Sequence, residues 1–350
     1  YNAPPASPAR ALAARTAPST PMTRLQATAI AHSNIAFVKY WRNRDPLLRL
    51  PYNDSLSMNL SAATTTTTVD FSDDLNTDRL TIDGEKHIGP ALERVTRQLD
   101  LVRLRAGLRL RAAVQSRNSF PMGTGIASSA SGFAALTMAA AQAAGLDLGE
   151  AELSALARRG SGSAARSIPG GYVLWHAGAG DRESFAESVF APDHWDLRDI
   201  VAIVSRRHKG LGSTDGHAAA EGSPLFAGRL AALPETLAVV RGALASRDLA
   251  RFGAAIEAEA LNLHAIAMTG RPPALYWNPA TVAVMHQVQA WRAEGLGVWF
   301  TLDAGPNVHL ICEGSDAAAV EGALRNLEFV EAVLPNRVGG AAHLAPTLVV

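Results

Sequence analysis

The chain has 350 residues, and 48% of them are hydrophobic, which is enough for one large core or two medium ones. Its formal net charge is zero, and no basic surface or acidic tail points to a nucleic acid. The apolar runs contain glycine, serine or arginine too often to cross a bilayer. The single cysteine, Cys312, excludes an intramolecular disulfide framework and fits a cytoplasmic protein; its apolar neighbours favour a core strand over a nucleophile.

The first 23 residues are rich in alanine, proline, serine and threonine and contain no acidic residue. We predict a disordered tail over residues 1–23. The alternatives are a transit peptide and sequence that precedes a true start at Met22. The texture changes at Leu25, where structured sequence is expected to begin.

The patterning after residue 24 predicts strands at 64–71, 80–82, 171–175, 200–204, 298–302 and 308–312, and two weaker strands near the end. It predicts helices at 88–101, 132–144, 148–158, 279–294 and 316–327, and a mostly helical region from 223 to 268. Asp83-Gly84 is typical of a hairpin turn. Strands and helices mix without regular βαβ alternation, which predicts an α+β fold with one domain over 24–204 and a second over 205–350.

The most informative stretch runs from Pro121 to Gly132 and is dense in glycine and serine. An alanine-rich helix follows it directly. Such a loop points backbone N–H groups and the positive end of the helix dipole at one spot, which is typical of a phosphate site. The spacing matches neither a Walker nor a Rossmann loop, so it leaves the nucleotide open. The alternative is a surface turn capped by a serine.

Only three of the 32 basic residues are lysines. Lys39 follows an apolar, strand-like run, so its charge is expected at a strand end facing a cleft, unless it extends from an edge strand into solvent. Lys209 lies in a second glycine-rich, anion-friendly loop, which is either a lid over substrate or an interdomain linker. Lys86 is expected in a hairpin turn.

Two further segments concentrate polar groups. Ser161 and Ser163 precede Arg166, and together these residues can form a carboxylate pocket; the alternative is a helix C-cap and a turn. Asp303 lies between two apolar strands and is a candidate base whose pKa burial could raise, or else an ordinary turn residue. No cluster of histidine, cysteine and aspartate has the spacing of a zinc site, so no metal ligands are predicted.

Together these motifs resemble the GHMP small-molecule kinase superfamily, and within it the mevalonate-type decarboxylases. The resemblance runs from about Ala27 to about Leu334. It rests on Asn34-Ile-Ala with Lys39-Tyr-Trp, Pro51 to Ser57, Phe120 to Gly132, Gly160-Ser-Gly-Ser-Ala-Ala-Arg166 and Asp303-Ala-Gly-Pro-Asn307. It implies a GHMP kinase fold, with an N-terminal ribosomal-protein-S5-like domain and a C-terminal ferredoxin-like domain. It also implies a cytoplasmic homodimer that takes a small-molecule substrate.

The enzymes of this family phosphorylate a tertiary 3-hydroxyl with MgATP, after which phosphate and CO2 leave. The resemblance makes Asp303 the group that orients the hydroxyl and takes its proton, and Lys39 the cation that offsets charge on the phosphoryl group. Ser161, Ser163 and Arg166 would hold the substrate carboxylate, and Tyr40 would bound the pocket. The expected ATP phosphate contacts are Gly123, Gly125, Ala127, Ser128, Ser129 and Ser131.

The chain departs from the diphosphate-specific enzymes after Lys-Tyr-Trp, where they usually read Gly-Lys-Arg and use that lysine for the diphosphate. Here Asn43 takes the place of the lysine, and no basic residue lies between His217 and Ser223. The resemblance therefore predicts mevalonate 5-phosphate as substrate and isopentenyl phosphate as product. Arg42 or Arg44 could compensate, which leaves the 5-diphosphate as the runner-up. A 3-kinase without decarboxylation and an inactive nucleotide-binding protein are the remaining alternatives.

Overall fold

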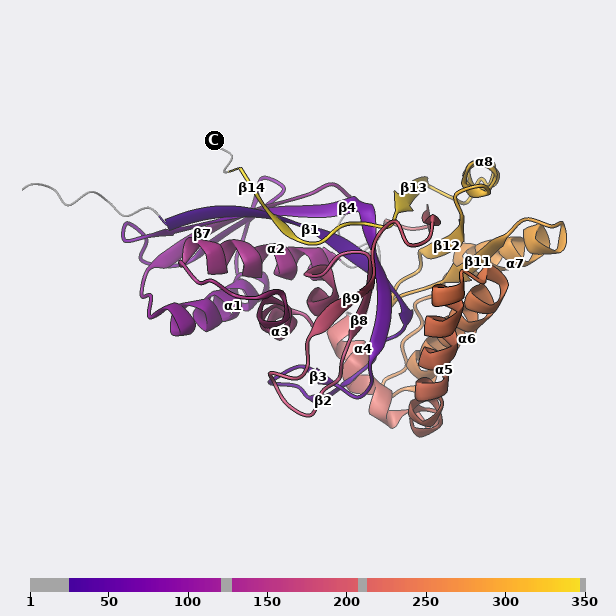
Figure 1. Ribbon diagram of the computed structural model, residues 1–350, viewed down its shortest axis with the longest axis horizontal. Helices are drawn as coiled ribbons and strands as arrows, with labels where there is room; N and C mark the ends of the chain where they lie inside the picture. Colours follow the sequence, from indigo (N-terminus) through magenta and orange to yellow (C-terminus); the bar gives the residue numbers. More distant parts are fainter. Residues whose placement is uncertain (1–24, 121–127, 207–212, 347–350) are drawn as a thin grey trace, which may run out of the picture.

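The computed structural model describes residues 25–120, 128–206 and 213–346. The tail predicted over residues 1–23 and the loop around Lys209 lie outside this part of the chain. Figure 1 shows two bodies side by side, a large sheet covered by helices on one of its faces and a smaller sheet backed by helices. This is the mixed α+β architecture that the sequence predicted. None of the helices described is long and apolar enough to pass through a membrane.

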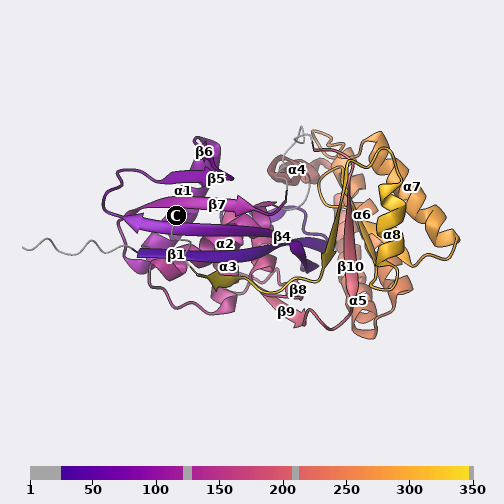
Figure 2. The same ribbon diagram turned by 90° about the horizontal axis from the view of Figure 1, so that it is seen from above.

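The first body is built on an eight-stranded sheet with the strand order β14-β1-β4-β7-β5-β6, in which β8 pairs with β4 and with β9. The long antiparallel pair of β1 (Leu25–Val38) and β4 (Ser55–Ser72) forms its centre, as Figure 2 shows from above. The other strands are β5 (Arg79–Ile82), β6 (Glu85–His87), β7 (Arg111–Asn118), β8 (Tyr172–Trp175), β9 (Ala186–Phe190) and β14 (His343–Ala345). The hairpin predicted at Asp83-Gly84 is confirmed, with positive φ angles at both residues.

Three helices pack on this sheet: α1 (Pro90–Ala106), α2 (Ser128–Ala143) and α3 (Glu150–Gly160). Buried alanines along α2 let the helix lie close to β1 and β4. Gly160 is the last residue of α3, and it must be glycine because a Cβ there would come within 2.1 Å of the Phe133 ring. The chain then forms a short 3-10 helix, η1 (Gly162–Ser167), which the sequence did not predict.

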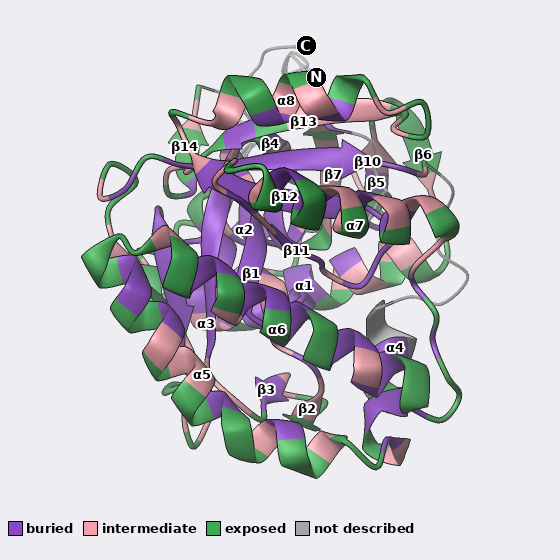
Figure 3. Ribbon diagram, turned by 90° about the vertical axis from the view of Figure 1, so that its right-hand side faces the viewer, coloured by how far each residue is buried: buried purple, intermediate pink, exposed green. Residues whose placement is uncertain are grey.

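The second body contains a four-stranded sheet in the order β11-β12-β10-β13. Its strands are β10 (Leu197–Ile203), β11 (Val298–Thr301), β12 (Val308–Glu313) and β13 (Ala332–Arg337), and its main helices are α5 (Phe226–Ser246), α6 (Leu249–Thr269), α7 (Pro279–Ala293) and α8 (Ala317–Arg325). Figure 3 shows these helices with exposed outer faces over buried strands. Cys312 is fully buried in this sheet, as predicted.

The sheets divide the chain differently from the boundary predicted at residue 204. β10 precedes that boundary but belongs to the second sheet, and β14 returns near the C-terminus to pair with β1 in the first. An apolar strand does not specify its partner, because pairing depends on which long-range neighbour completes the sheet. A shared core that includes Phe37 and Phe252, whose ring centroids lie 4.8 Å apart, joins the two bodies.

Candidate active site

Lys39 and Asp303 form a buried ion pair where the two bodies meet. Lys39 follows the end of β1 and is 1% exposed, and Asp303 lies in the turn after β11. The Lys39 Nζ atom lies 2.9 Å from Asp303 Oδ1 and also donates a hydrogen bond to the Ala36 carbonyl at 2.5 Å. Lys39 thus lies at a strand end, as expected, and its charge is paired with a carboxylate of the other body.

The ion pair sets the charge states of both groups. Burial lowers the pKa of Lys39, although the Asp303 carboxylate opposes the shift. Burial alone would raise the pKa of Asp303, but the Lys39 ammonium outweighs it, with smaller help from His309 and Arg166, so that this pKa lies below its ordinary value. The expectation that burial raises the pKa of Asp303 is therefore wrong, because it ignored a cation that is distant in the sequence.

The main chain of Lys39 is held by a second buried ion pair that sequence reasoning missed. Glu259 on α6 accepts the Lys39 N–H at 3.0 Å, and Arg229 on α5 donates to the Lys39 carbonyl at 2.8 Å. Arg229 and Glu259 also bond to each other, and both are almost fully buried. Asn53 donates to the same carbonyl at 3.2 Å. Two helices of the second body thus fix the peptide that carries the Lys39 side chain.

His264, also on α6, contacts the main chain of Asp303. Its ring forms a hydrogen bond with the main chain of Asp303 and packs against Trp277 at 4.9 Å and Tyr276 at 5.9 Å between ring centroids. Burial and the charge of Lys39 lower the pKa of His264 to about 3, so the ring is neutral at physiological pH. No local motif in an apolar helix distinguishes this histidine from an ordinary core residue.

Arg166 is a buried cation on η1 with neutral partners. It donates to Asn34 Oδ1 at 3.1 and 3.3 Å and to Ser55 Oγ at 2.9 Å, and its guanidinium lies over the Trp175 ring. Burial lowers its pKa to about 10, which still leaves it charged at neutral pH. Within the residues described it forms no ion pair with a carboxylate. A buried guanidinium with neutral partners favours binding of an anionic ligand.

Three hydroxyl groups connect Arg166's segment to the start of α2. Ser129 Oγ lies 3.2 Å from Ser161 Oγ, which lies 3.3 Å from Ser163 Oγ. Ser128 and Ser129 form the first turn of α2, as the predicted anion site requires. The Ser131 side chain instead turns toward the sheet and bonds to Thr65 Oγ1 at 2.7 Å. Three other predicted phosphate contacts, Gly123, Gly125 and Ala127, lie outside the described residues.

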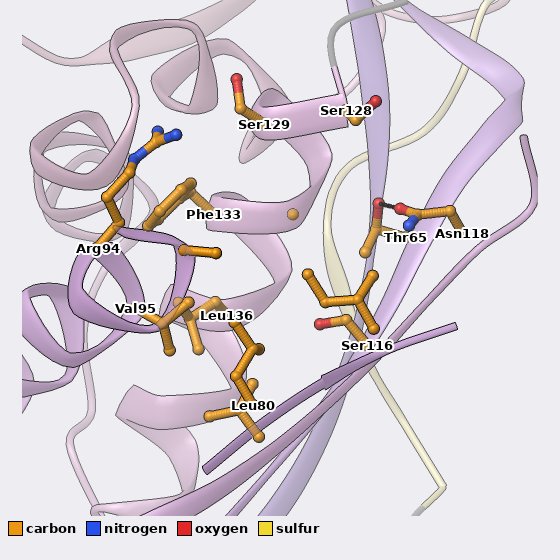
Figure 4. Close-up of a pocket in the computed structure, with 14 residues that line it drawn as sticks. Thr65, Leu80, Arg94, Val95, Ser116, Asn118, Ser128, Ser129, Phe133 and Leu136 are labelled. Atoms are coloured by element: carbon orange, nitrogen blue, oxygen red, sulfur yellow. Dashed lines mark hydrogen bonds between the residues drawn. The ribbon is translucent and has the colours of Figure 1, made fainter. Parts of the chain in front are cut away.

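A cavity of about 220 Å³ lies against this first turn of α2, between the sheet and α1. Figure 4 shows apolar side chains, among them Leu80, Val95 and Leu136, on its inner wall. Ser128, Ser129, Arg94 and Asn118 supply polar groups toward the start of α2. An apolar chamber next to a helix N-terminus can take a flat apolar group that carries phosphates.

Tyr40 and Asn43 form a hydrogen-bonded pair near η1. The Tyr40 hydroxyl donates to Asn43 Oδ1 at 2.5 Å, and its ring packs against Trp175 at 4.8 Å and His217 at 4.5 Å between centroids. Gly162 must be glycine here, since a Cβ would come within 2.7 Å of the Tyr40 ring. Burial raises the pKa of Tyr40 to about 12, so the phenol is neutral.

Arg42 and Arg44, the two candidate replacements for the missing lysine, have other partners. Arg42 forms an ion pair with Glu221, and its guanidinium lies 5.5 Å from the Tyr52 ring centroid. Arg44 is exposed and donates to the carbonyls of Ala177 and Gly178. One Nη group of each guanidinium is therefore already bonded to the protein.

Two family models match the chain: the diphosphomevalonate decarboxylase-like N-terminal domain over residues 31–186, and the mevalonate 5-diphosphate decarboxylase C-terminal domain over residues 199–340. The phosphomevalonate decarboxylase of Haloferax volcanii is 38% identical over 288 residues, which cover 82% of this chain and 88% of that protein. The human diphosphomevalonate decarboxylase is 37% identical over 302 residues, or 80% of this chain and 75% of that one.

A solved structure, MDDEF in complex with MVAPP, AMPPCP and magnesium, superposes with a TM-score of 0.88 at 36% identity and covers 93% of this chain and 100% of that chain. The fold is therefore that of the GHMP superfamily. The chain belongs to its mevalonate-type decarboxylase family, as the motifs predicted.

Proposed function

We propose that this protein uses MgATP to convert mevalonate 5-phosphate into isopentenyl phosphate, releasing ADP, phosphate and CO2. The observation that carries the choice of substrate is the set of contacts around Asn43. The position of the expected lysine holds a neutral amide bonded to Tyr40, and Arg42 and Arg44 are engaged elsewhere. The similarity to the Haloferax volcanii phosphomevalonate decarboxylase supports the same substrate.

The charge count favours one phosphate over two. Each charge-assisted hydrogen bond contributes about 1.5–3 kcal/mol, so a diphosphate loses much of its binding energy where lysine is replaced by asparagine. Arg42 would have to leave Glu221 to compensate, which would break an existing ion pair. A monophosphate demands fewer cations and fits the site as it stands.

The cavity beside α2 suits the nucleotide. Its apolar inner wall would take the adenosine, and the α2 N-terminus with Ser128 and Ser129 would meet the phosphates. Within the described residues no cluster of acidic or histidine side chains could hold a metal ion, so magnesium would be held largely by phosphate oxygens, as that ion prefers. MgATP supplies the phosphoryl group for the first step.

Asp303 and Lys39 would act on the 3-hydroxyl. The Asp303 carboxylate accepts the hydroxyl hydrogen bond and orients the oxygen toward the phosphoryl group, and takes its proton as the new O–P bond forms. Its lowered pKa keeps the carboxylate ionised at neutral pH, so it is in the form that can accept the proton. The Lys39 ammonium, 2.9 Å from that carboxylate, offsets negative charge on the transferring group.

Arg166 would hold the substrate carboxylate for the second step, with Ser161 and Ser163 beside it. The C3–O bond breaks and phosphate leaves with the bonding pair, while the C–CO2 bond supplies the electrons of the new double bond. Hydrogen bonds to Asn34 and Ser55 hold Arg166 in place, so its guanidinium can orient the carboxylate without moving itself. The interaction between Arg166 and the substrate carboxylate must stay of moderate strength, because stabilising the ground-state carboxylate slows CO2 loss.

The deciding experiment measures CO2 release with MgATP and compares mevalonate 5-phosphate with mevalonate 5-diphosphate. A higher kcat/KM for the monophosphate supports the proposal. Preference for the diphosphate would make this an isopentenyl diphosphate-forming enzyme. ADP release without CO2 would indicate a 3-kinase, and no turnover would indicate a nucleotide-binding protein. The cytoplasmic homodimer stays a prediction from the resemblance.

A further inference from the structure

Arg49 differs from the other arginines that follow Lys39 in the chain. Its Nε donates to the Arg159 carbonyl at 2.9 Å. In the described parts of the chain it forms no ion pair with any carboxylate, whereas Arg42 has Glu221. Its terminal Nη groups also make no hydrogen bond there. A half-buried guanidinium anchored through one N–H therefore keeps its four other donors for a ligand.

The backbone places Arg49 beside the hydrogen-bonded pair of Tyr40 and Asn43. The short strands β2 (Asn43–Asp45) and β3 (Leu50–Pro51) pair with Asn43 opposite Pro51, so the turn carrying Arg49 returns next to Asn43. The φ angle of +51° at Arg49 belongs to the left-handed region, which is uncommon for a side chain other than glycine. The chain accepts this conformation where it turns into β3.

The carbonyl that anchors Arg49 belongs to the last turn of α3, immediately before the serine segment. Arg94 donates to the next carbonyl, Gly160, at 3.3 Å, so two cations meet at adjacent peptide groups. Ser161 follows directly and caps the helix. Like charges brought together without a carboxylate favour an anion between or beside them.

The neutral groups around Arg49 feel its charge. Burial is the main cause of the shifted pKa values of Tyr40 and His217, and the Arg49 guanidinium is the next cause for both. His217 is neutral, since its pKa lies at about 3, and its Nδ1 accepts the Arg42 N–H at 2.7 Å. The two groups that feel the Arg49 charge in this way are a neutral phenol and a neutral imidazole, and neither cancels it.

We propose that Arg49 binds the 5-phosphate of the substrate, as the cation that remains beside Asn43. The proposal rests on the proposed function for the identity of the phosphoester. A guanidinium fork with a fixed Nε offers two parallel N–H groups that match two oxygens of one phosphate. Arg49 is therefore assigned to binding of the phosphate attached to C5 of the substrate.

The test compares Arg49→Met with Arg44→Met, a matched loss of a guanidinium from the same segment. The kcat/KM for mevalonate 5-phosphate should fall about 10- to 100-fold in Arg49→Met, mostly through KM. The KM for MgATP should stay within about twofold, and Arg44→Met should change neither constant by more than that. Arg49→Lys, which keeps the charge and loses the fork, should recover part of the loss.

A change below threefold in Arg49→Met, or an equal loss in Arg44→Met, would overturn the assignment. So would an equal rise in both KM values, which would indicate a general structural role at the end of α3. Failure of the proposed function is a separate result: the unmodified enzyme would prefer the 5-diphosphate. In that case the KM of Arg49→Met for the diphosphate decides whether Arg49 binds phosphate at all, and an unchanged value would again overturn it.

Discussion

Lys39 Nζ and Asp303 Oδ1 lie 2.9 Å apart although 264 positions separate the two residues in the chain. Lys39 directly follows β1 of the first body, and Asp303 follows β11 of the second. The contact joins the two bodies at the point where the chemistry is proposed. It also makes each charge depend on the other, so removing either partner tests both the site and its electrostatics.

Asp303→Asn should fold normally and lose activity by at least about a hundredfold, because asparagine can accept the 3-hydroxyl hydrogen bond but cannot take its proton. Loss of the carboxylate also leaves the Lys39 ammonium buried without its ion-pair partner. Steady-state CO2 release and a thermal melt measure the two effects. Asp181→Asn, which removes the partly exposed partner of the buried Arg158, is the control. Substantial residual turnover in Asp303→Asn would remove its assigned role.

Glu259→Gln should move the alkaline limb of the kcat profile to lower pH. Burial lowers the pKa of Lys39, and the charges of Asp303 and then Glu259 work against that shift. Without the Glu259 charge the protonated amine is less favourable, so Lys39 loses its proton at lower pH. Glu257→Gln is the matched control two positions away, since Glu257 pairs with Arg292 instead. Identical profiles for Glu259→Gln and the unmodified enzyme would contradict a link between Glu259 and Lys39.

His264→Phe should keep the aromatic packing and lower kcat by about five- to tenfold, since one hydrogen bond to the main chain of Asp303 contributes about 1 kcal/mol. The KM for the phosphoester should change little. Because the pKa of His264 is about 3, its protonation should contribute no step to the activity between about pH 5 and 8. A step in that range that disappears in His264→Phe would show that the ring titrates after all.

The motifs that could be predicted from the sequence lie where local signals are strong. Serine and glycine density marks Ser161 and Ser163 before Arg166, and a Gly-Pro turn marks Asp303. These residue types serve turns, caps and anion contacts through their own backbone, so the sequence alone carries the information. The structure places Ser161 within hydrogen-bond reach of both Ser163 and Ser129, while the carboxylate pocket that the two predicted serines would form with Arg166 stays a prediction.

The groups that hold the Lys39 and Asp303 segments could not be predicted in the same way. Arg229 lies in the first turn of α5, and Glu259 and His264 lie inside α6. An isolated polar residue on such a helix is usually exposed to solvent. Glu259 is buried only because it meets a peptide 220 positions earlier in the chain. The predicted direction of the Asp303 pKa shift was wrong for the same reason, since the sign of the shift depends on Lys39, which is distant in the sequence. Long-range pairing decides these features.

Asn43→Lys should shift specificity toward mevalonate 5-diphosphate. An ammonium at this position adds a charge-assisted contact for a second phosphate, so the ratio of kcat/KM for diphosphate over monophosphate should rise about tenfold or more. The substitution also removes the acceptor that holds the Tyr40 hydroxyl at 2.5 Å, which should lower kcat somewhat for both substrates.

Asn43→Met separates these two effects, because it loses the same acceptor and adds no charge. The ratio should stay near that of the unmodified enzyme in Asn43→Met and rise only in Asn43→Lys. If the ratio is unchanged in Asn43→Lys, position 43 does not face the substrate phosphates. The engagement of Arg42 and Arg44 would then carry no information about which phosphoester the enzyme uses, and the argument for a monophosphate would lose its structural basis.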